Sequence, residues 1–267
     1  MSQPSVSRIV ARLEEDVGAT LLFRTTRAVT LTETGSDYLA RIEEILAALS
    51  EADHAARGTG ELRGTLRVGA GSSLSVREVI PRLPAFLARH PGLRVEVTIS
   101  DARQDLIVEG VDIALRLGAL TDSRARARKL SEAPRLLVAS PAYIARAGAP
   151  ESPADLAGHS VILGPGGASV LVFKTGERNV SVRVEGRVAV TANHGAIAAA
   201  VEGMGITATS FWGCRAELAA GALVHVLANW EMPNVELHAV FPPGRAAAPA
   251  ARASADYMAR ELRGEAV

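Results

Sequence analysis

Strand-like and helix-like segments alternate through most of this chain. The strand-like segments, short and apolar, are 65–69, 93–99, 111–117, 135–139, 161–163, 180–190, 206–209 and 235–241. The helix-like segments are 76–89, 101–109, 141–146, 195–202, 212–219 and 253–263. Such alternation predicts an α/β fold with parallel sheets that carry helices on both faces. Because about 200 residues is long for one such sheet, we expect two hinged subdomains. The first covers about 61–140 and 243–267, and the second about 141–242.

The composition is that of an ordinary globular protein, with 48% hydrophobic and 22% charged residues. The formal net charge is zero, so the chain as a whole lacks the basic excess that is typical of nucleic-acid binding. Residues 1–60 carry six arginines and nine acidic residues, a formal charge of −3. Any contact with DNA must therefore come from a local patch.

Several function classes find no support in the sequence. The polar N-terminus lacks the apolar region of a signal peptide, and no apolar run approaches a membrane span. The one cysteine, Cys214, excludes an intramolecular disulfide and is typical of a small buried residue. No His/Cys cluster has metal-ligand spacing, and residues 164–167 lack the Lys-Ser/Thr of a phosphate-binding loop. We expect a cytoplasmic protein that is not an enzyme, with no metal, cofactor or membrane partner.

Residues 1–31 predict a helix followed by a basic hairpin. Ser2 can cap the helix, Pro4 suits its first turn, and Gly18 ends it. Its apolar residues recur at helical spacing: Val6, Ile9, Val10, Leu13 and Val17. Two β-prone runs then flank the Thr/Arg-rich residues 24–27. A helix with a basic hairpin is typical of the second half of a winged helix-turn-helix.

A long helix is expected next, over about 32–57. Thr32 is a good N-cap. The helix carries a heptad-like apolar seam with spacings of 4, 3, 4, 3 and 4, made of Tyr38, Ile42, Ile45, Leu49, Ala52 and Ala56. A seam of this length has to be covered, and the corresponding helix of a second subunit is the economical partner.

Several motifs, in their order and spacing, resemble LysR-type transcriptional regulators. They are SQPSVSR at 2–8, LLFRTTR at 21–27, LTETG at 31–35, GTLRV at 64–68, DIALRLG at 112–118, SPAY at 140–143, PADLAGH at 153–159 and GMGI at 203–206. The resemblance covers nearly the whole chain. It implies a partial winged helix-turn-helix at 1–31 and a linker and dimerisation helix at 32–60. It also implies a two-subdomain α/β effector-binding domain of the type 2 periplasmic-binding-protein kind at 61–267.

The resemblance implies that the first helix is a recognition helix and the hairpin is a wing. The residues expected at DNA are Ser2, Gln3, Pro4, Ser5, Ser7 and Arg8 on the helix and Arg24, Thr25 and Arg27 on the wing. Gln can read adenine and Arg can read guanine, whereas wing residues contact phosphates. We expect Arg8→Ala to relax sequence preference and Arg27→Ala to weaken binding uniformly. Charge alone favours a plainer explanation, a solvated helix face and an ordinary hairpin.

Four junctions between strands and helices match places where effector domains of this family line the cleft between subdomains. Their residues are Ser72, Ser73, Arg116, Gly118, Asn193, His194, Thr209 and Phe211. Ligands of open α/β sheets lie beyond the carboxyl ends of strands, and hydroxyl and N–H groups there can hold a small organic anion. The same residue types also serve as ordinary caps and turns. Arg116 suits either a ligand clamp or an internal salt bridge.

The mechanism that the resemblance implies is a population shift. A small-molecule effector between the subdomains biases their geometry, and thereby the way that homodimers or tetramers place recognition helices on double-stranded DNA. The alternative is a truncated, dimeric ligand-binding protein without competent DNA binding. A complete winged helix-turn-helix has two further helices before the recognition helix, so roughly 25–30 residues would be missing.

Overall fold

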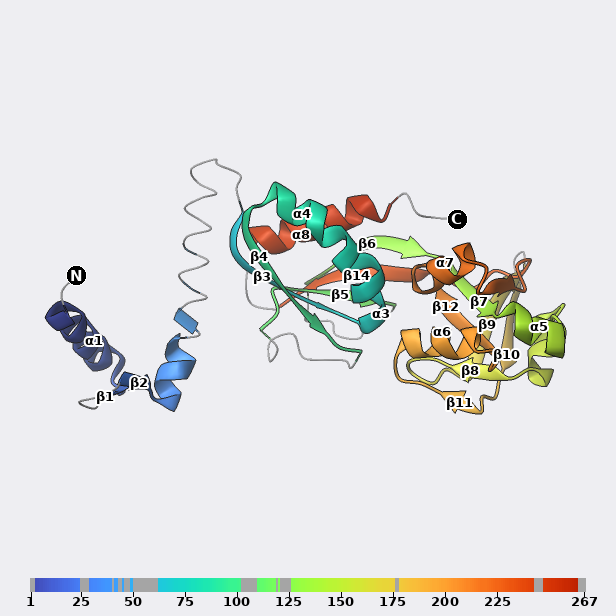
Figure 1. The fold of residues 1–267 in the computed structure, drawn as a ribbon, viewed down its shortest axis with the longest axis horizontal. Coiled ribbons are helices and arrows are strands. Elements are labelled where there is room, and N and C mark those ends of the chain that lie inside the picture. The colour runs from blue at the N-terminus through green and yellow to red at the C-terminus, as the bar shows by residue number, and fades with distance from the viewer. Residues whose placement is uncertain are drawn as a thin grey trace. The chain divides into compact units, whose positions relative to one another are not determined.

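The computed structural model describes residues 3–24, 29–39, 41, 42, 45, 49, 62–101, 110–118, 120, 126–175, 178–242 and 247–263. The chain divides into two compact units, Met1–Glu61 and Leu62–Val267, and each is considered by itself (Figure 1). Within the described residues, no helix combines the length and apolarity of a membrane span. In the same residues, no group of His, Cys, Asp or Glu side chains could hold a metal ion.

The first unit contains the expected helix and hairpin. Helix α1 spans Gln3–Val17 and is followed by Gly18, whose φ of 72° is the left-handed conformation that glycine adopts readily. Strands β1 (Leu22–Arg24) and β2 (Val29–Leu31) pair antiparallel. The apolar face of α1 is open to solvent in this unit, with Ile9 54% exposed.

Two polar side chains hold the ends of the hairpin in place. The Oε1 atom of Glu14 accepts hydrogen bonds from the N–H groups of Leu21, at 2.8 Å, and Leu22, at 2.9 Å. The hydroxyl of Thr32 accepts a hydrogen bond of 2.8 Å from the N–H of Gly35. Thr32 is therefore the expected N-cap of the next helix, and the same hydroxyl donates to the carbonyl of Thr20, at 2.8 Å.

The expected long helix is described in part. Residues 33–39, 41, 42, 45 and 49 are helical. Along the seam, Tyr38 and Ile42 are half-buried, whereas Ile45 is 56% and Leu49 57% exposed. Ala52 and Ala56 lie outside the described residues. Two large apolar side chains at heptad-like spacing therefore face solvent in the single chain.

The second unit contains two five-stranded sheets. The strand order of the first is β4-β3-β5-β14-β6. Its strands are β3 (Arg63–Ala70), β4 (Gly92–Ile99), β5 (Ile113–Leu117), β6 (Arg126–Ala133) and β14 (Val235–Phe241). Strand β3 pairs parallel with β4 and β5, whereas β14 pairs antiparallel with β5 and β6. The carboxyl ends of β3, β4 and β5 therefore lie at one end of the sheet.

The second sheet has the order β11-β8-β12-β7-β13. Its strands are β7 (Arg135–Ala139), β8 (Val161–Leu163), β11 (Val188–Ala189), β12 (Ile206–Ser210) and β13 (Val224–Val226). Strand β8 pairs parallel with β11 and β12, and β7 pairs antiparallel with β12 and β13. A separate hairpin consists of β9 (Val170–Thr175) and β10 (Arg178–Arg183).

The sheets differ from the expectation in two respects. Both are mixed rather than parallel, because the chain crosses between subdomains twice and each crossing brings in antiparallel strands. The crossings also move the subdomain boundaries: β7, expected in subdomain 1, belongs to the second sheet, and β14, expected in subdomain 2, belongs to the first. Local sequence pattern identifies both strands but not the sheet that each one joins.

Helices pack against both sheets. One continuous helical run consists of α3 (Ser72–Leu74), the π-helix η1 (Ser75–Val79), the 3-10 turn η2 (Ile80–Arg82) and α4 (Leu83–Arg89). The remaining helices are α5 (Pro141–Ala147), the 3-10 turn η3 (Pro153–Gly158), α6 (Asn193–Val201), α7 (Phe211–Ala219) and α8 (Pro249–Glu261). Apart from Asp101, the helix expected at 101–109 lies outside the described residues.

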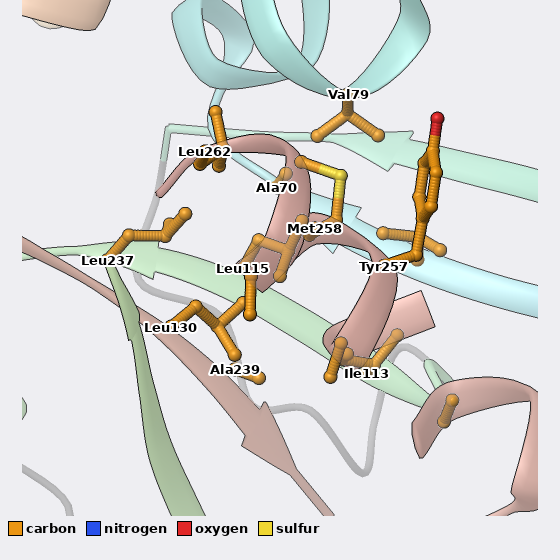
Figure 2. Packing of buried hydrophobic residues seen from close by; sticks show 14 of the residues in the cluster. Ala70, Val79, Ile113, Leu115, Leu130, Leu237, Ala239, Tyr257, Met258 and Leu262 are labelled. Atoms are coloured by element: carbon orange, nitrogen blue, oxygen red, sulfur yellow. The ribbon is translucent and has the colours of Figure 1, made fainter. Parts of the chain in front are cut away.

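The largest core lies between the first sheet and its helices. Figure 2 shows Tyr257, Met258 and Leu262, from the segment of α8, beside the sheet residues Ile113 and Leu115. Each such side chain contributes about 1.5–3 kcal/mol when fully buried. Trp212, from α7, belongs to this core although α7 packs on the second sheet. The subdomains are therefore joined by packing as well as by the two crossings.

Candidate functional sites

Five of the residues expected at the effector cleft meet in one cluster of hydrogen bonds. Ser72 Oγ lies 2.9 Å from His194 Nδ1. Asn193 Nδ2 donates to Ser73 Oγ at 3.3 Å, and Thr209 Oγ1 donates to Asn193 Oδ1 at 2.9 Å. Ser72 and Ser73 belong to the first subdomain, and the other three residues belong to the second. The cluster therefore bridges the two subdomains.

The topology explains why these residues meet. Ser72 and Ser73 begin the helical run that follows β3, Thr209 lies near the end of β12, and Asn193 begins α6. All are near the ends of strands or the starts of helices, where side chains of an open sheet converge. Burial falls across the cluster: Thr209 is 3% exposed, whereas His194 is exposed.

Asp101 completes the cluster and is absent from the residues expected from the sequence. Its Oδ1 accepts a 2.9 Å hydrogen bond from the N–H of Ser72, and its Oδ2 accepts the hydroxyl proton of Ser72. The Ser72 hydroxyl then has no proton left for His194, so Nδ1 of His194 must be the donor between them. The one signal in the sequence is that Asp101 follows β4, a parallel neighbour of β3.

The order of this chain of hydrogen bonds has a chemical consequence. A nucleophilic triad needs a histidine between the serine and the carboxylate, so that the histidine accepts the serine proton. Here the serine lies between the histidine and the carboxylate. The arrangement links two subdomains and does not activate a nucleophile.

A glycine allows the cluster to be this compact. A Cβ atom on Gly213 would lie 2.5 Å from Thr209 Oγ1 and 2.6 Å from Asn193 Nδ2. Any side chain there would displace the Thr209 hydroxyl and the Asn193 amide group from their positions. Helix α7 can therefore approach the cluster only because residue 213 lacks a side chain.

The other three expected cleft residues have different surroundings. Half-buried Arg116 lies opposite His238 across β5 and β14, and the N–H of Gly118 donates to the carbonyl of Glu236 at 2.8 Å. Gly118 has a φ of 85°, which favours glycine. Phe211 begins α7 and packs against the cores of both subdomains. Arg116 and Gly118 thus lie at the carboxyl end of β5, a parallel neighbour of β3. Phe211, in contrast, packs against hydrophobic cores.

A second set of contacts joins the subdomains between η1 and α7. The guanidinium of Arg77 forms two hydrogen bonds with the carboxylate of Glu217, at 2.6 and 2.8 Å. Arg215 Nη2 lies 3.1 Å from Oε2 of Glu78, whose side chain is fully buried and also accepts from Arg82 at 2.8 Å. Burial opposes ionisation of Glu217, but the hydrogen bonds from Arg77 outweigh it and leave its pKa below the ordinary value. No signal in the sequence identified these ion pairs.

On the DNA side, the structure places only part of the expected set. Gln3, Pro4, Ser5 and Ser7 lie in the first turns of α1, and Arg24 ends β1. Arg8 is exposed on α1. Ser2, Thr25 and Arg27 lie outside the described residues. The described part of the set therefore offers one exposed cation on the helix that was expected to read DNA.

The chain matches two family models. Residues 59–263 match the LysR substrate binding domain. Residues 1–36 match the bacterial regulatory helix-turn-helix protein, lysR family. Neither match favours a ligand-binding protein without a role in DNA binding.

Known proteins agree with these models. An uncharacterized HTH-type transcriptional regulator of Haemophilus influenzae is 32% identical over 92% of this chain and 86% of its own length. The solved structure of CrgA, a LysR-type transcriptional regulator from Neisseria meningitidis, superposes with a TM-score of 0.68 at 31% identity, covering 98% of this chain and 90% of that one. The Vibrio cholerae virulence activator AphB gives a TM-score of 0.63 at 27% identity, covering 97% and 89%. These relatives are transcriptional regulators and not enzymes, and this chain belongs to the LysR family of bacterial helix-turn-helix transcriptional regulators.

Proposed function

We propose that the effector of this regulator binds where Ser72, Ser73, Asn193, His194 and Thr209 meet, and that it exchanges hydrogen bonds with them. The observation that carries the proposal is the pair of direct bridges between subdomains, Ser72–His194 and Ser73–Asn193. Ser73 is 8% exposed and Thr209 3%. Buried polar groups of this kind need partners in every state. A ligand that enters must therefore supply the hydrogen bonds that it breaks.

The charges of the cluster limit the chemistry of the effector. Helix α6 directs its N-terminus at the cluster without a side-chain cap, and His194 adds a donor, which together favour an anionic group. Asp101 adds a negative charge beside Ser72. A small organic acid that also carries a hydroxyl or amino donor fits both. Arg116 is the candidate for a further contact at the end of β5.

The helical run from Ser72 to Val79 offers a route from the ligand to the arrangement of the subdomains. Its first residues lie in the cluster, and Arg77 and Glu78 bind α7 about one turn later. A ligand that binds more strongly to Ser72 and Ser73, on one subdomain, than to His194 and Asn193, on the other, will favour one position of η1 relative to α7. Effector binding is then coupled to subdomain geometry through two states with different affinity.

On the DNA side, we propose that α1 reads base edges through Arg8 and its N-terminal polar residues, and that the wing contacts phosphates. Exposed Ile45 and Leu49 support a homodimer through the linker helix, and two dimers form a tetramer on longer operators. Reading chromosomal DNA places the protein in the cytoplasm. Arg8→Ala should flatten the difference in affinity between the operator and mutated operators. Arg94→Ala, which removes the same charge at an exposed position of the second unit, serves as the control.

The effector site is tested by reciprocal coupling. Operator DNA is selected from a random pool with the full chain, and small hydroxy and amino acids are titrated against operator affinity. For an acid that shifts operator affinity, Ser72→Ala and Asn193→Ala should weaken its binding about tenfold, with operator affinity in its absence changed much less. Ser131→Ala removes a hydrogen bond to Leu262 remote from the cluster and is the control. Unchanged ligand affinity in both cluster variants would refute the site.

A further inference from the structure

A hollow lined by arginine lies on the first subdomain, apart from the effector cluster. Its volume is about 350 Å³, and it is lined by Arg126, Ala127, Arg128, Phe241, Ala247 and Arg252. These residues come from the start of β6, the end of β14 and the start of α8. Because β14 runs antiparallel to β5, Phe241 lies at the opposite end of the sheet from Gly118 and the effector cluster.

The arginines of the hollow carry more positive charge than the described residues around them balance. Arg128 forms an ion pair of 2.6 Å with Asp256. Among the described residues, neither Arg126 nor Arg252 has an acidic partner. Arginines held close together repel one another, and an anion between them relieves that repulsion. Helix α8, thirteen residues long, adds the positive end of its dipole beside Ala247.

The floor of the hollow is apolar. Phe241 is 8% exposed and packs in the main core, so its ring is held in place. Ala127 and Ala247, which have small apolar side chains, also line the hollow. Guanidinium groups pair with carboxylates in two parallel hydrogen bonds and also stack on aromatic faces. The hollow thus combines cations at its rim with a rigid apolar surface beneath them.

We propose that this hollow is a second ligand site, which binds a small organic anion with a flat apolar body. The carboxylate of the ligand pairs with Arg126 and Arg252, and its apolar part lies on Phe241 between the two alanines. The volume is within the range of small-molecule sites, about 300–1,000 Å³. This site is independent of the effector cluster and does not rest on the function proposed for that cluster.

The test uses 2-naphthoate, titrated into the full chain by calorimetry. 2-Naphthol has the same apolar body without the charge, and inorganic phosphate has the charge without the apolar body. We expect 2-naphthoate to bind at least tenfold more tightly than either. Arg126→Gln and Arg252→Gln should each weaken 2-naphthoate about tenfold. Arg260→Gln, an exposed position further along α8, should leave it unchanged.

Each remaining outcome decides against the site. Binding that survives both Arg126→Gln and Arg252→Gln lies elsewhere, and loss in Ser72→Ala and Asn193→Ala instead would place it in the effector cluster. Equal affinity for 2-naphthoate and 2-naphthol would mean that the arginines do not recognise the charge. The absence of any measurable 2-naphthoate binding would overturn the proposal outright.

Discussion

The closeness of two backbone segments in the first unit depends on one residue. A Cβ atom on Gly35 would lie 1.9 Å from the carbonyl oxygen of Leu21. Neither atom is at the flexible end of a side chain, so the contact can be relieved only by moving the hairpin away from the linker helix. The LTETG motif therefore carries a steric requirement at its last position and a cap at Thr32.

Gly35→Ala should therefore loosen the first unit. Overpacking of this kind costs about 1–3 kcal/mol, and we expect faster amide hydrogen exchange through residues 20–36. Ser36→Ala, at the neighbouring exposed position, is the control. The exchange is followed by mass spectrometry of peptides from the full chain. Equal protection in the two variants would mean that the hairpin and helix are not closed as described.

Cys214 should be chemically inert in the folded protein. It is fully buried, and burial, with a smaller contribution from Glu217, raises the pKa of its thiol to about 12. Reaction with iodoacetamide at pH 8 should be at least about a hundredfold slower than that of a free thiol, because the thiolate is the nucleophile. Labelling at the rate of glutathione would contradict the described burial.

The same shift makes stability depend on pH in the alkaline range. The folded pKa lies above the ordinary value of 9.0, so the unfolded chain releases the thiol proton first as pH rises. The contribution of the protonated Cys214 thiol to the free energy of unfolding is complete below pH 9. It is lost as the pH rises toward about 12. Urea unfolding across this range, with Cys214→Ala for comparison, measures it. The variant should lose stability less steeply with pH than the wild type.

The elements show which parts of the fold a sequence can predict. Strands β7 and β14 were expected at their observed bounds because both are short, largely apolar runs. Strand β6 was missed because half of its eight residues, RARKLSEA, are charged. It is an edge strand with one face at the surface, and edges carry such charges to avoid pairing with other chains. Strands β9 and β13 were also missed, and the single strand expected at 180–190 forms two strands, β10 and β11.

The candidate site was likewise predictable from the sequence only in part. Residues at the ends of strands and the starts of helices, such as Ser72 and Asn193, could be expected because open sheets gather them at one end. The hydrogen-bond and ion-pair partners of individual residues could not be predicted. Arg77 and Glu217 are 140 positions apart in the sequence, and no local pattern connects them. Trp212 was expected on its helix, but its place in the core of the other subdomain depends on the two chain crossings.

The ion pair between η1 and α7 should stabilise the joined subdomains measurably. Arg77 and Glu217 are only 19% and 20% exposed and bond in two places. A double-mutant cycle with Arg77→Ala and Glu217→Ala should give a coupling of about 1–2 kcal/mol in the free energy of unfolding. The control is Lys129 with Glu132, an exposed pair for which we expect at most about 0.5 kcal/mol.

The pH dependence of this coupling has a definite sign. The pKa of Glu217 is lowered from 4.5, so its contribution to stability is present above pH 4.5 and is lost as pH falls through the lower folded pKa. The coupling should therefore be constant from pH 5 to 7 and decline only in more acid solution. A coupling no larger than that of the control pair would mean that the contact does not hold the subdomains together.

At the scale of the whole molecule, DNA reading and ligand binding reside in separate compact units. The second unit has complete cores of its own, whereas the first leaves Ile45 and Leu49 more than half exposed on its long helix. An apolar seam that a chain cannot cover by itself is satisfied by the same seam of a second copy. If two copies pair through this seam as proposed, the second unit can remain folded when that pairing is lost.

Ile45→Asp should abolish pairing through the linker helix without unfolding the second unit. A charge in the centre of the seam should convert dimer to monomer at micromolar concentration, as measured by sedimentation velocity. Because a monomer engages one half-site rather than two, operator affinity should fall at least about a hundredfold, and the dependence of binding on salt should become shallower.

The second unit should keep its unfolding midpoint, since its cores do not include residue 45. Ser36→Asp adds the same charge at an exposed position off the seam and should leave all four measured quantities unchanged. A dimer that survives Ile45→Asp with full operator affinity would mean that the copies pair through another surface, and that the exposed seam has a different role.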